Sequence, residues 1–169
     1  DGFPAGAEAD VQTFGAMYPQ GTREFMAMAL MLATLARRSD AIRLGPQHIR
    51  DGRIIFTARK NSAPVTVPVI GELVEALAHH KTEHLTFLTT QFGAPFSDAG
   101  AGNWFGDRCK AAGLPVRAHG LRKLGAIRLA YAGAMVPELI AWGGWKTERE
   151  PLRYIREAER ARLADQGAE

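Results

Sequence analysis

The side chains that could do chemistry together in this sequence are mostly cationic. Arg37 and Arg38 end an apolar stretch in the segment RRSD, and Lys60 lies between two segments rich in β-forming residues. His119 and Arg122 are three residues apart in HGLR, which places them on one face of a helix. A guanidinium group is permanently charged and planar, so it suits two parallel hydrogen bonds to phosphate oxygens. The set therefore indicates chemistry at a phosphate.

A tyrosine near the C-terminus is a further residue that could do chemistry. Tyr154 follows Trp145 by nine residues in the segment GGWKTEREPLRY. The sequence has no GxxxxGK[ST], GxGxxG, HExxH or GxSxG motif, and its histidines lack metal-ligand spacing. Phosphate chemistry here must then use cationic side chains, and we expect no metal and no cofactor.

Each of these features also has an ordinary structural explanation. Arginines at the end of a helix complement its dipole, and a lysine in a hairpin is commonly solvated. A histidine and an arginine three residues apart often form a surface pair, and a tyrosine in a terminal helix often packs against the core. The order and spacing of all the features together carry the argument.

Charge is distributed unevenly along the chain. Residues 1–36 contain one base and four acids, whereas residues 37–60 contain seven bases and two acids. With an isoelectric point near 9.3, this basic block indicates an anionic partner, most often nucleic acid, although a solvated basic surface fits too. The single cysteine, Cys109, excludes a disulfide within the chain. The longest apolar run, residues 25–36, is shorter than the roughly 20 residues of a membrane span.

The elements that must position these residues are mostly helices. A length of 169 residues, 46% of them hydrophobic, fits one domain with its own core. Turn residues around the β-rich segments 53–59 and 64–69 predict an antiparallel hairpin with Lys60 at its tip. The predicted fold class is mainly α with a small antiparallel β-sheet (α+β). Helices are predicted over residues 8–17, 23–36, 71–80, 98–112, 119–132, 136–142 and 148–165, with a basic turn at 37–40, a short helix to about 44, and a short strand or extended loop at 85–90.

In this order and spacing, the residues resemble the catalytic domain of the tyrosine recombinases, the phage integrase family. The family pattern is an arginine in an R-x-S-[DE] context, a hairpin lysine, H-x-x-R, a histidine or tryptophan, and then a tyrosine. The segments VTVPV, FGAPFS and AAGLP add to a resemblance that extends over residues 10–165 and is strongest to integrases of bacterial mobile elements. It implies the integrase catalytic-core fold and six catalytic residues, which are Arg37, Lys60, His119, Arg122, Trp145 and Tyr154.

The resemblance implies a site-specific DNA recombinase that integrates or excises mobile DNA. Tyr154 would attack a DNA phosphorus and form a 3′-phosphotyrosyl intermediate. Arg37 and Arg122 would bind the non-bridging oxygens of that phosphate. Lys60 would protonate the leaving 5′-oxygen, and His119 would assist proton transfer.

Further residues would support the reaction or bind DNA. Trp145 stands where the family usually has histidine, and it would either donate its N–H to a phosphate oxygen or only pack in the core. Asp40 would support Arg37 or its neighbours by a hydrogen bond. Leu35 stands where the family usually has glycine. The predicted DNA-binding residues are Arg38, Arg43, Arg59 and Lys123, the last in place of a common histidine.

The resemblance also implies a domain organisation and partners. Residues 1–7 are expected to be a linker or an irregular start, and residues 8–169 the catalytic domain. Because the chain begins with Asp1, we expect a fragment without the N-terminal core-binding domain of family members. The expected partner is double-stranded DNA, with no membrane, in the bacterial cytoplasm at the nucleoid. The full-length protein is expected to act as a homo-tetramer on paired DNA sites, and the fragment alone to be monomeric.

The sequence leaves other functions open. A type IB topoisomerase-like strand transferase would use the same residue types to relax supercoils, although AHGLRK and GGWKT are more similar to integrases. A non-catalytic DNA-binding module could retain the same fold. A helical interaction domain with accidental similarity is the third alternative.

Overall fold

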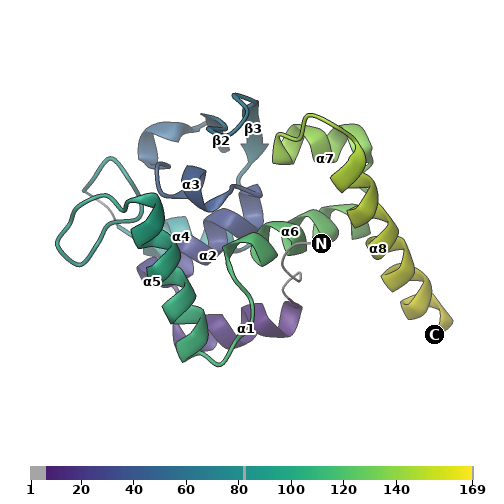
Figure 1. Cartoon of the computed structure of the whole chain (residues 1–169), viewed down its shortest axis with the longest axis horizontal. Coiled ribbons are helices and arrows are strands. Elements are labelled where there is room, and N and C mark those ends of the chain that lie inside the picture. Colours follow the sequence, from purple (N-terminus) through teal and green to yellow (C-terminus); the bar gives the residue numbers. More distant parts are fainter. Residues whose placement is uncertain (1–6, 82, 169) are drawn as a thin grey trace.

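The computed structural model describes residues 7–81 and 83–168 (Figure 1). The predicted linker, residues 1–7, lies outside the described residues except for Ala7. The described part is mostly helical with one small antiparallel sheet, which confirms the predicted fold class. Its elements are α1 (Glu8–Met17), α2 (Arg23–Thr34), α3 (Arg38–Ala41), the 3-10 helix η1 (Pro46–His48), β1 (Ile49–Arg50), β2 (Arg53–Thr57), β3 (Pro64–Pro68), α4 (Glu72–His79), α5 (Asp98–Ala111), α6 (Ala118–Tyr131), α7 (Val136–Gly143) and α8 (Arg149–Gly167).

The helix α2 is the centre of the molecule. Thr22 caps its start, with its hydroxyl oxygen accepting a hydrogen bond from the Phe25 N–H at 3.1 Å. Every residue from Phe25 to Thr34 is buried, because α4, α5 and α6 pack around this helix. The helix ends two residues earlier than predicted, since Leu35 adopts a left-handed backbone with a φ of 60°. The chain then turns sharply just before Arg37.

The sheet has three antiparallel strands in the order β1-β2-β3. Ile54 of β2 lies opposite Val67 of β3, and both are buried in the core cluster that also contains the α2 side chains. The predicted hairpin is confirmed, with Lys60 in the turn between β2 and β3. The strand β1 was not predicted, because two residues that pair across the Asp51-Gly52 turn leave no periodic pattern.

Two other local predictions need correction or refinement. The predicted basic turn at 37–40 is largely the helix α3, because the Arg37 carbonyl accepts hydrogen bonds from the backbone N–H groups of Asp40 and Ala41. Of the two alternatives for residues 85–90, the extended loop is correct, with a single isolated bridge between Thr89 and Pro95.

The core is divided into two clusters. The larger surrounds α2 and includes Cys109. The smaller lies where α6, α7 and α8 meet, and it contains Leu35, Trp145 and Tyr154. In Figure 1, α7 and α8 lie on one side of the body, and α8 runs outward to the C-terminal end. No helix in the described part of the chain is long and apolar enough to cross a membrane.

Candidate active site

Arg122 is fixed by the crossing of α6 and α2. At the crossing lies Gly125, where a side-chain methyl group would overlap the Leu32 carbonyl oxygen. One turn earlier on α6, the Nη1 of Arg122 donates to the Leu35 carbonyl, and its Nη2 donates to the Gly143 carbonyl at 3.0 Å. The residue is only 3% exposed. Arg122 therefore joins the end of α2 to the end of α7, and the orientation of its guanidinium group is fixed.

Arg37 brings a second guanidinium group to the same place. Its Nη1 atom is buried and has no hydrogen-bond partner among the described residues. Burial and the charge of Arg37 lower the pKa of Arg122 to about 10, so the two groups are close enough to repel each other. Within the described part of the chain, no carboxylate forms an ion pair with either arginine. Two close cations of this kind suit an anion with two available oxygens.

Trp145 and Tyr154 lie beside Arg122 in this site. The Arg122 guanidinium carbon lies 4.4 Å from the centroid of a Trp145 ring, and the rings of Trp145 and Tyr154 are 5.7 Å apart. Burial, followed by the charge of Glu150, raises the pKa of Tyr154 to about 12, although Arg122 acts in the opposite direction. The phenol is therefore protonated at neutral pH, and it needs a proton acceptor to become a nucleophile.

The Trp145 N–H donates to Glu150 in this structure. The distance from Nε1 to Oε2 is 2.9 Å. To donate to a phosphate oxygen, as predicted, Trp145 would have to break this hydrogen bond to Glu150. The prediction of a catalytic Trp145 stays a prediction, and the ring has a structural role against Arg122 and Tyr154. Sequence reasoning missed Glu150, because an acidic residue in the first turn of a helix is common and signals nothing by itself.

The hairpin is docked onto the loop between α7 and α8. The side-chain amide of Asn61 donates to the Gly144 carbonyl at 2.8 Å, and its oxygen accepts from the Ala63 N–H at 3.1 Å. Gly144 has a φ of 67°, and a Cβ there would lie 3.3 Å from the Ala63 Cβ. Lys60, the residue before Asn61, is exposed and has no hydrogen bond or ion pair within the described part of the chain. Asn61 was missed because its partner lies 83 residues away.

His119 lies in the first turn of α6, near the two arginines. Partial burial lowers its pKa first, and the charges of Lys123, Arg122 and Arg37 lower it further, against an opposing effect of Glu150. The imidazole is therefore neutral at neutral pH and able to accept a proton. Lys123, predicted to bind DNA, is only 7% exposed, so it belongs to the interior of the site.

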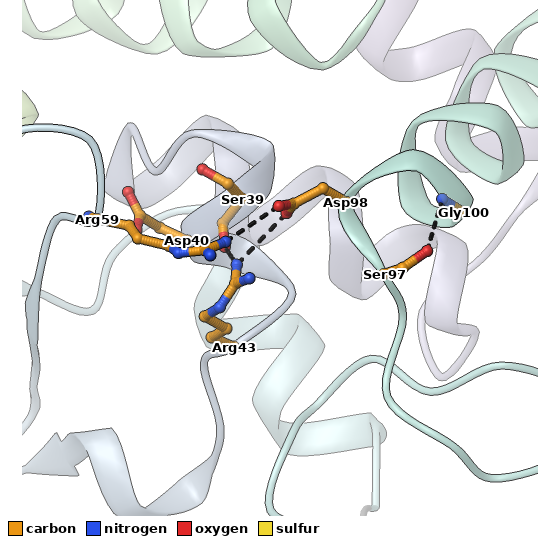
Figure 2. A network of polar contacts seen from close by, with 7 residues as sticks. All are labelled: Ser39, Asp40, Arg43, Arg59, Ser97, Asp98 and Gly100. Atoms are coloured by element: carbon orange, nitrogen blue, oxygen red, sulfur yellow. Dashed lines mark hydrogen bonds and ion pairs between the residues drawn. The ribbon is translucent and has the colours of Figure 1, made fainter.

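A second group of arginines lies around Asp98 at the start of α5 (Figure 2). The Asp98 carboxylate forms ion pairs with Arg43 at 3.4 Å and Arg59 at 3.0 Å. Slight burial raises the pKa of Asp98, but Arg43 and Arg59 more than offset this, so the pKa lies below its usual value. The side chain of Ser97 caps α5 by accepting from the Gly100 N–H. Two predicted DNA-binding residues are thus held by one carboxylate.

Asp40 connects this second group to the hairpin. Its Oδ1 accepts a hydrogen bond from the Arg59 backbone N–H at 3.0 Å. The predicted support for Arg37 is therefore indirect, because the carboxylate fastens the end of β2 beside α3. Arg38, also predicted to bind DNA, is exposed and lies over Gly102, where a Cβ would be 2.7 Å from the Arg38 Nη1. The described residues contain no group of three or more His, Cys, Asp or Glu placed to hold a metal ion.

Comparison with solved structures defines the class of the fold. A lambda integrase dimer bound to a COC′ core site matches with a TM-score of 0.73 and 21% identity, over 90% of this chain and 47% of that chain. XerA recombinase matches with a TM-score of 0.76 and 16% identity, over 98% and 66%. The Tn1549 transposon integrase in complex with transposon right end DNA matches with a TM-score of 0.73 and 18% identity, over 97% and 68%. The fold is that of tyrosine recombinase catalytic domains.

The family follows from the sequence itself. The model of the phage integrase family matches residues 9–160, and the chain belongs to that family. Among curated proteins, none matches this chain. The chain spans about half the length of the lambda integrase chain with the core site. It matches the lambda integrase catalytic core over 84% of this chain and 95% of that chain, with a TM-score of 0.70 and 20% identity.

Proposed function

We propose that this chain is the catalytic domain of a site-specific DNA recombinase that cuts and rejoins DNA through Tyr154. The observation that carries the proposal is the pair Arg37 and Arg122 beside a buried tyrosine. Among the described residues neither arginine has an ion-pair partner, and Arg37 has a buried donor without an acceptor. A DNA phosphodiester supplies the charge and the two oxygens that this pair can bind.

The cleavage step exchanges one phosphate ester for another. The Tyr154 oxygen attacks the phosphorus, the new O–P bond forms, and the bond from phosphorus to the 5′-oxygen breaks. The phenol proton passes to the neutral His119, and Lys60 donates a proton to the leaving 5′-oxygen. Another 5′-hydroxyl then attacks the 3′-phosphotyrosyl ester and restores DNA. Since one phosphate ester replaces another, the step requires no ATP, and the cationic side chains supply the charge stabilisation.

The arginines supply most of the electrostatic stabilisation in this proposal. Negative charge on the phosphoryl oxygens develops between Arg37 and Arg122 as the phenol attacks. A positioned donor of this kind contributes about 3–4 kcal/mol to the transition state. Arg122 is already held by two carbonyl groups, so little reorganisation is needed when the phosphate binds. Trp145 supports this arrangement through its ring.

The proposal extends to the partners of the full-length protein. One similar structure is a lambda integrase tetramer bound to a Holliday junction. We propose that the full-length protein likewise acts as a homo-tetramer on paired DNA sites, at the nucleoid of a bacterial cell. The present chain alone is expected to be monomeric and to bind DNA weakly. Size-exclusion chromatography with light scattering checks the first expectation, and a tetramer without DNA would contradict it.

Covalent capture tests the reaction. The substrate is a pool of duplexes from the ends of the source element, with the scissile 5′-bridging oxygen replaced by sulfur so that cleavage cannot reverse. In the presence of a chelator, we expect a protein–DNA adduct with the natural chain and none with Tyr154→Phe. Tyr131→Phe is the matched control, because Tyr131 lies outside the site on α6 and should leave the adduct unchanged.

Two outcomes would contradict the proposed reaction. An adduct that persists in Tyr154→Phe would place the nucleophile elsewhere. Duplex binding without any adduct, by both this chain and the full-length protein, would favour a non-catalytic DNA-binding module. Relaxation of supercoiled plasmid without exchange between paired sites would instead favour a topoisomerase-like activity.

A further inference from the structure

Glu150 lies inside the candidate active site, although nothing in the sequence pattern marks it. It is in the first turn of α8, four residues before Tyr154, and its side chain is half-buried. Its Oε2 accepts the hydrogen bond from the Trp145 Nε1–H. Because the Trp145 ring contacts both Arg122 and Tyr154, this bond fixes a ring that touches two predicted catalytic groups.

The charge of Glu150 acts on the same groups. It favours the protonated forms of His119 and Arg122 on α6 and of Tyr154 on α8, raising the pKa of each. Asp40 acts in the same direction on Arg122. Within the described part of the chain Arg122 has no direct ion pair, and the field of Glu150 offsets part of its charge.

We propose that Glu150 is a positioning residue and an internal counter-ion, which holds Trp145 in place and partly neutralises Arg122 until a DNA phosphodiester takes over that role. The proposal rests on the proposed function, since the incoming anion is the scissile phosphate. A buried cation without a nearby negative charge is costly, so the carboxylate stabilises the domain in the absence of DNA. Once the phosphate enters, two negative charges share the site, and the carboxylate weakens DNA binding. One residue thus has opposite effects on stability and on affinity.

The variant Glu150→Gln separates charge from hydrogen bonding. The amide oxygen of glutamine can still accept the Trp145 N–H, but the negative charge is gone. We expect the Kd for a labelled duplex to fall about fivefold at fixed low salt, while the melting temperature also falls. Glu150→Ala removes the acceptor as well. We expect it to have the lower melting temperature of the two variants, and its Trp145 fluorescence to change because the indole is released.

A matched control lies two residues away. Glu148 is exposed at the start of α8, and Glu148→Gln changes the net charge of the chain by the same amount. Fluorescence anisotropy with the same duplex then distinguishes a local effect of Glu150 from a general gain in positive charge. We expect Glu148→Gln to raise affinity by much less than Glu150→Gln, with no change in melting temperature.

A direct titration of Tyr154 measures the effect of the Glu150 charge on the pKa of the phenol without DNA. The phenolate absorbance of each variant is recorded after a rapid jump to alkaline pH, and the matching spectrum with Tyr154→Phe is subtracted. Tyr154 also faces Arg122 from α6 and Arg153 and Glu157 from α8, and these stay constant. We expect Glu150→Gln to lower the apparent pKa of Tyr154 by about one pH unit, and Glu148→Gln to leave it unchanged.

The outcomes separate the two proposals. If Glu150→Gln matches Glu148→Gln in both affinity and Tyr154 titration, Glu150 is only a structural hydrogen-bond acceptor and the counter-ion proposal is overturned. If neither the variants, the natural chain nor the full-length protein binds duplex, the proposed function fails. The titration of Tyr154 still decides the role of the Glu150 charge in that case.

Discussion

The two arginine groups of this domain are held in different ways. Arg43 and Arg59 share the exposed carboxylate of Asp98, with side chains 45% and 57% exposed. Arg122 is 3% exposed and is held by two backbone carbonyl groups. An exposed ion pair contributes little and exchanges easily with solvent or phosphate. Carbonyl groups fix Arg122 in direction without neutralising it, so its charge remains for a ligand.

The difference separates two contributions to DNA chemistry. The exposed group can bind backbone phosphates one at a time and with strong salt dependence. The inner group, Arg37 and the buried Arg122, is preorganised for one phosphate at which charge develops. The turn between β2 and β3 connects them, because Asp40 and Asp98 hold Arg59 there and Asn61 contacts Gly144. Lys60 therefore lies between the two groups.

The largest expected effect is on Lys60. If this lysine protonates the leaving 5′-oxygen, Lys60→Ala should slow cleavage of ordinary DNA by about 100-fold or more. A sulfur leaving group departs as a thiolate and needs no proton, so the same variant should cleave the sulfur-substituted duplex at nearly the natural rate. Single-turnover rates on the two duplexes check this. Equal losses on both would show that Lys60 acts in binding, like the exposed arginines.

Arg122 and Arg59 should differ in their contributions to stability. Arg122→Ala leaves the Leu35 and Gly143 carbonyls without this donor, although it also removes a buried charge. We expect a net loss of about 2 kcal/mol in the free energy of unfolding. For Arg59→Ala we expect about 0.5 kcal/mol, since its partner Asp98 is 43% exposed. Chemical denaturation checks both values, and similar losses would remove the basis of the comparison.

The pH dependence of cleavage tests whether His119, near Arg37 and Arg122, is the proton acceptor. The pKa of His119 is lowered below its ordinary value of 6.5, so the imidazole stays neutral as pH falls to that value. Cleavage should stay level between pH 8 and pH 7 and should decline only below about pH 6.5, by up to tenfold per pH unit. His119→Gln should be slower throughout and lack this decline. An unchanged profile in His119→Gln would assign the decline to another group.

The smallest expected effect is on the exposed group. Asp98→Asn releases Arg43 and Arg59, so affinity for non-specific duplex should rise a few-fold, with a steeper salt dependence. Stability should fall by less than about 1 kcal/mol. Asp107→Asn on the same helix is the matched control, because Asp107 is exposed and changes the charge equally. Equal gains for the two variants would mean that the Asp98 ion pairs do not restrain the arginines.

The sequence predicted most of what depends on local pattern. The long helices and the β2–β3 hairpin were correct because apolar spacing, turn residues and caps each mark them. The two residues of β1 were missed, and the short helix predicted to end near residue 44 is α3, which ends three residues earlier at Ala41, since tertiary contacts stabilise such short elements. One such contact is the hydrogen bond from the Arg59 N–H to Asp40.

In the candidate site, too, local motifs were predicted and long-range contacts were not. The motif spacing named Arg37, His119, Arg122 and Tyr154, and the structure gathers them around the end of α2. The motif spacing could not show that Glu150 accepts a hydrogen bond from the Trp145 N–H or that Asn61 contacts Gly144, because these are pairwise contacts without a sequence signal. Nor could it show that Leu35 takes the left-handed turn where the family usually has glycine.

The central claim is that Arg37 and Arg122 act on the reacting phosphate, and that Arg43 and Arg59 act only on binding. The direct test compares the double variants Arg37→Lys/Arg122→Lys and Arg43→Lys/Arg59→Lys in the covalent capture assay at saturating duplex. Lysine keeps each charge but loses the planar fork. We predict that the first pair loses adduct formation by about 100-fold or more while duplex affinity changes little, and that the second pair forms adduct at nearly the natural rate. Normal adduct formation by the first pair would contradict the account.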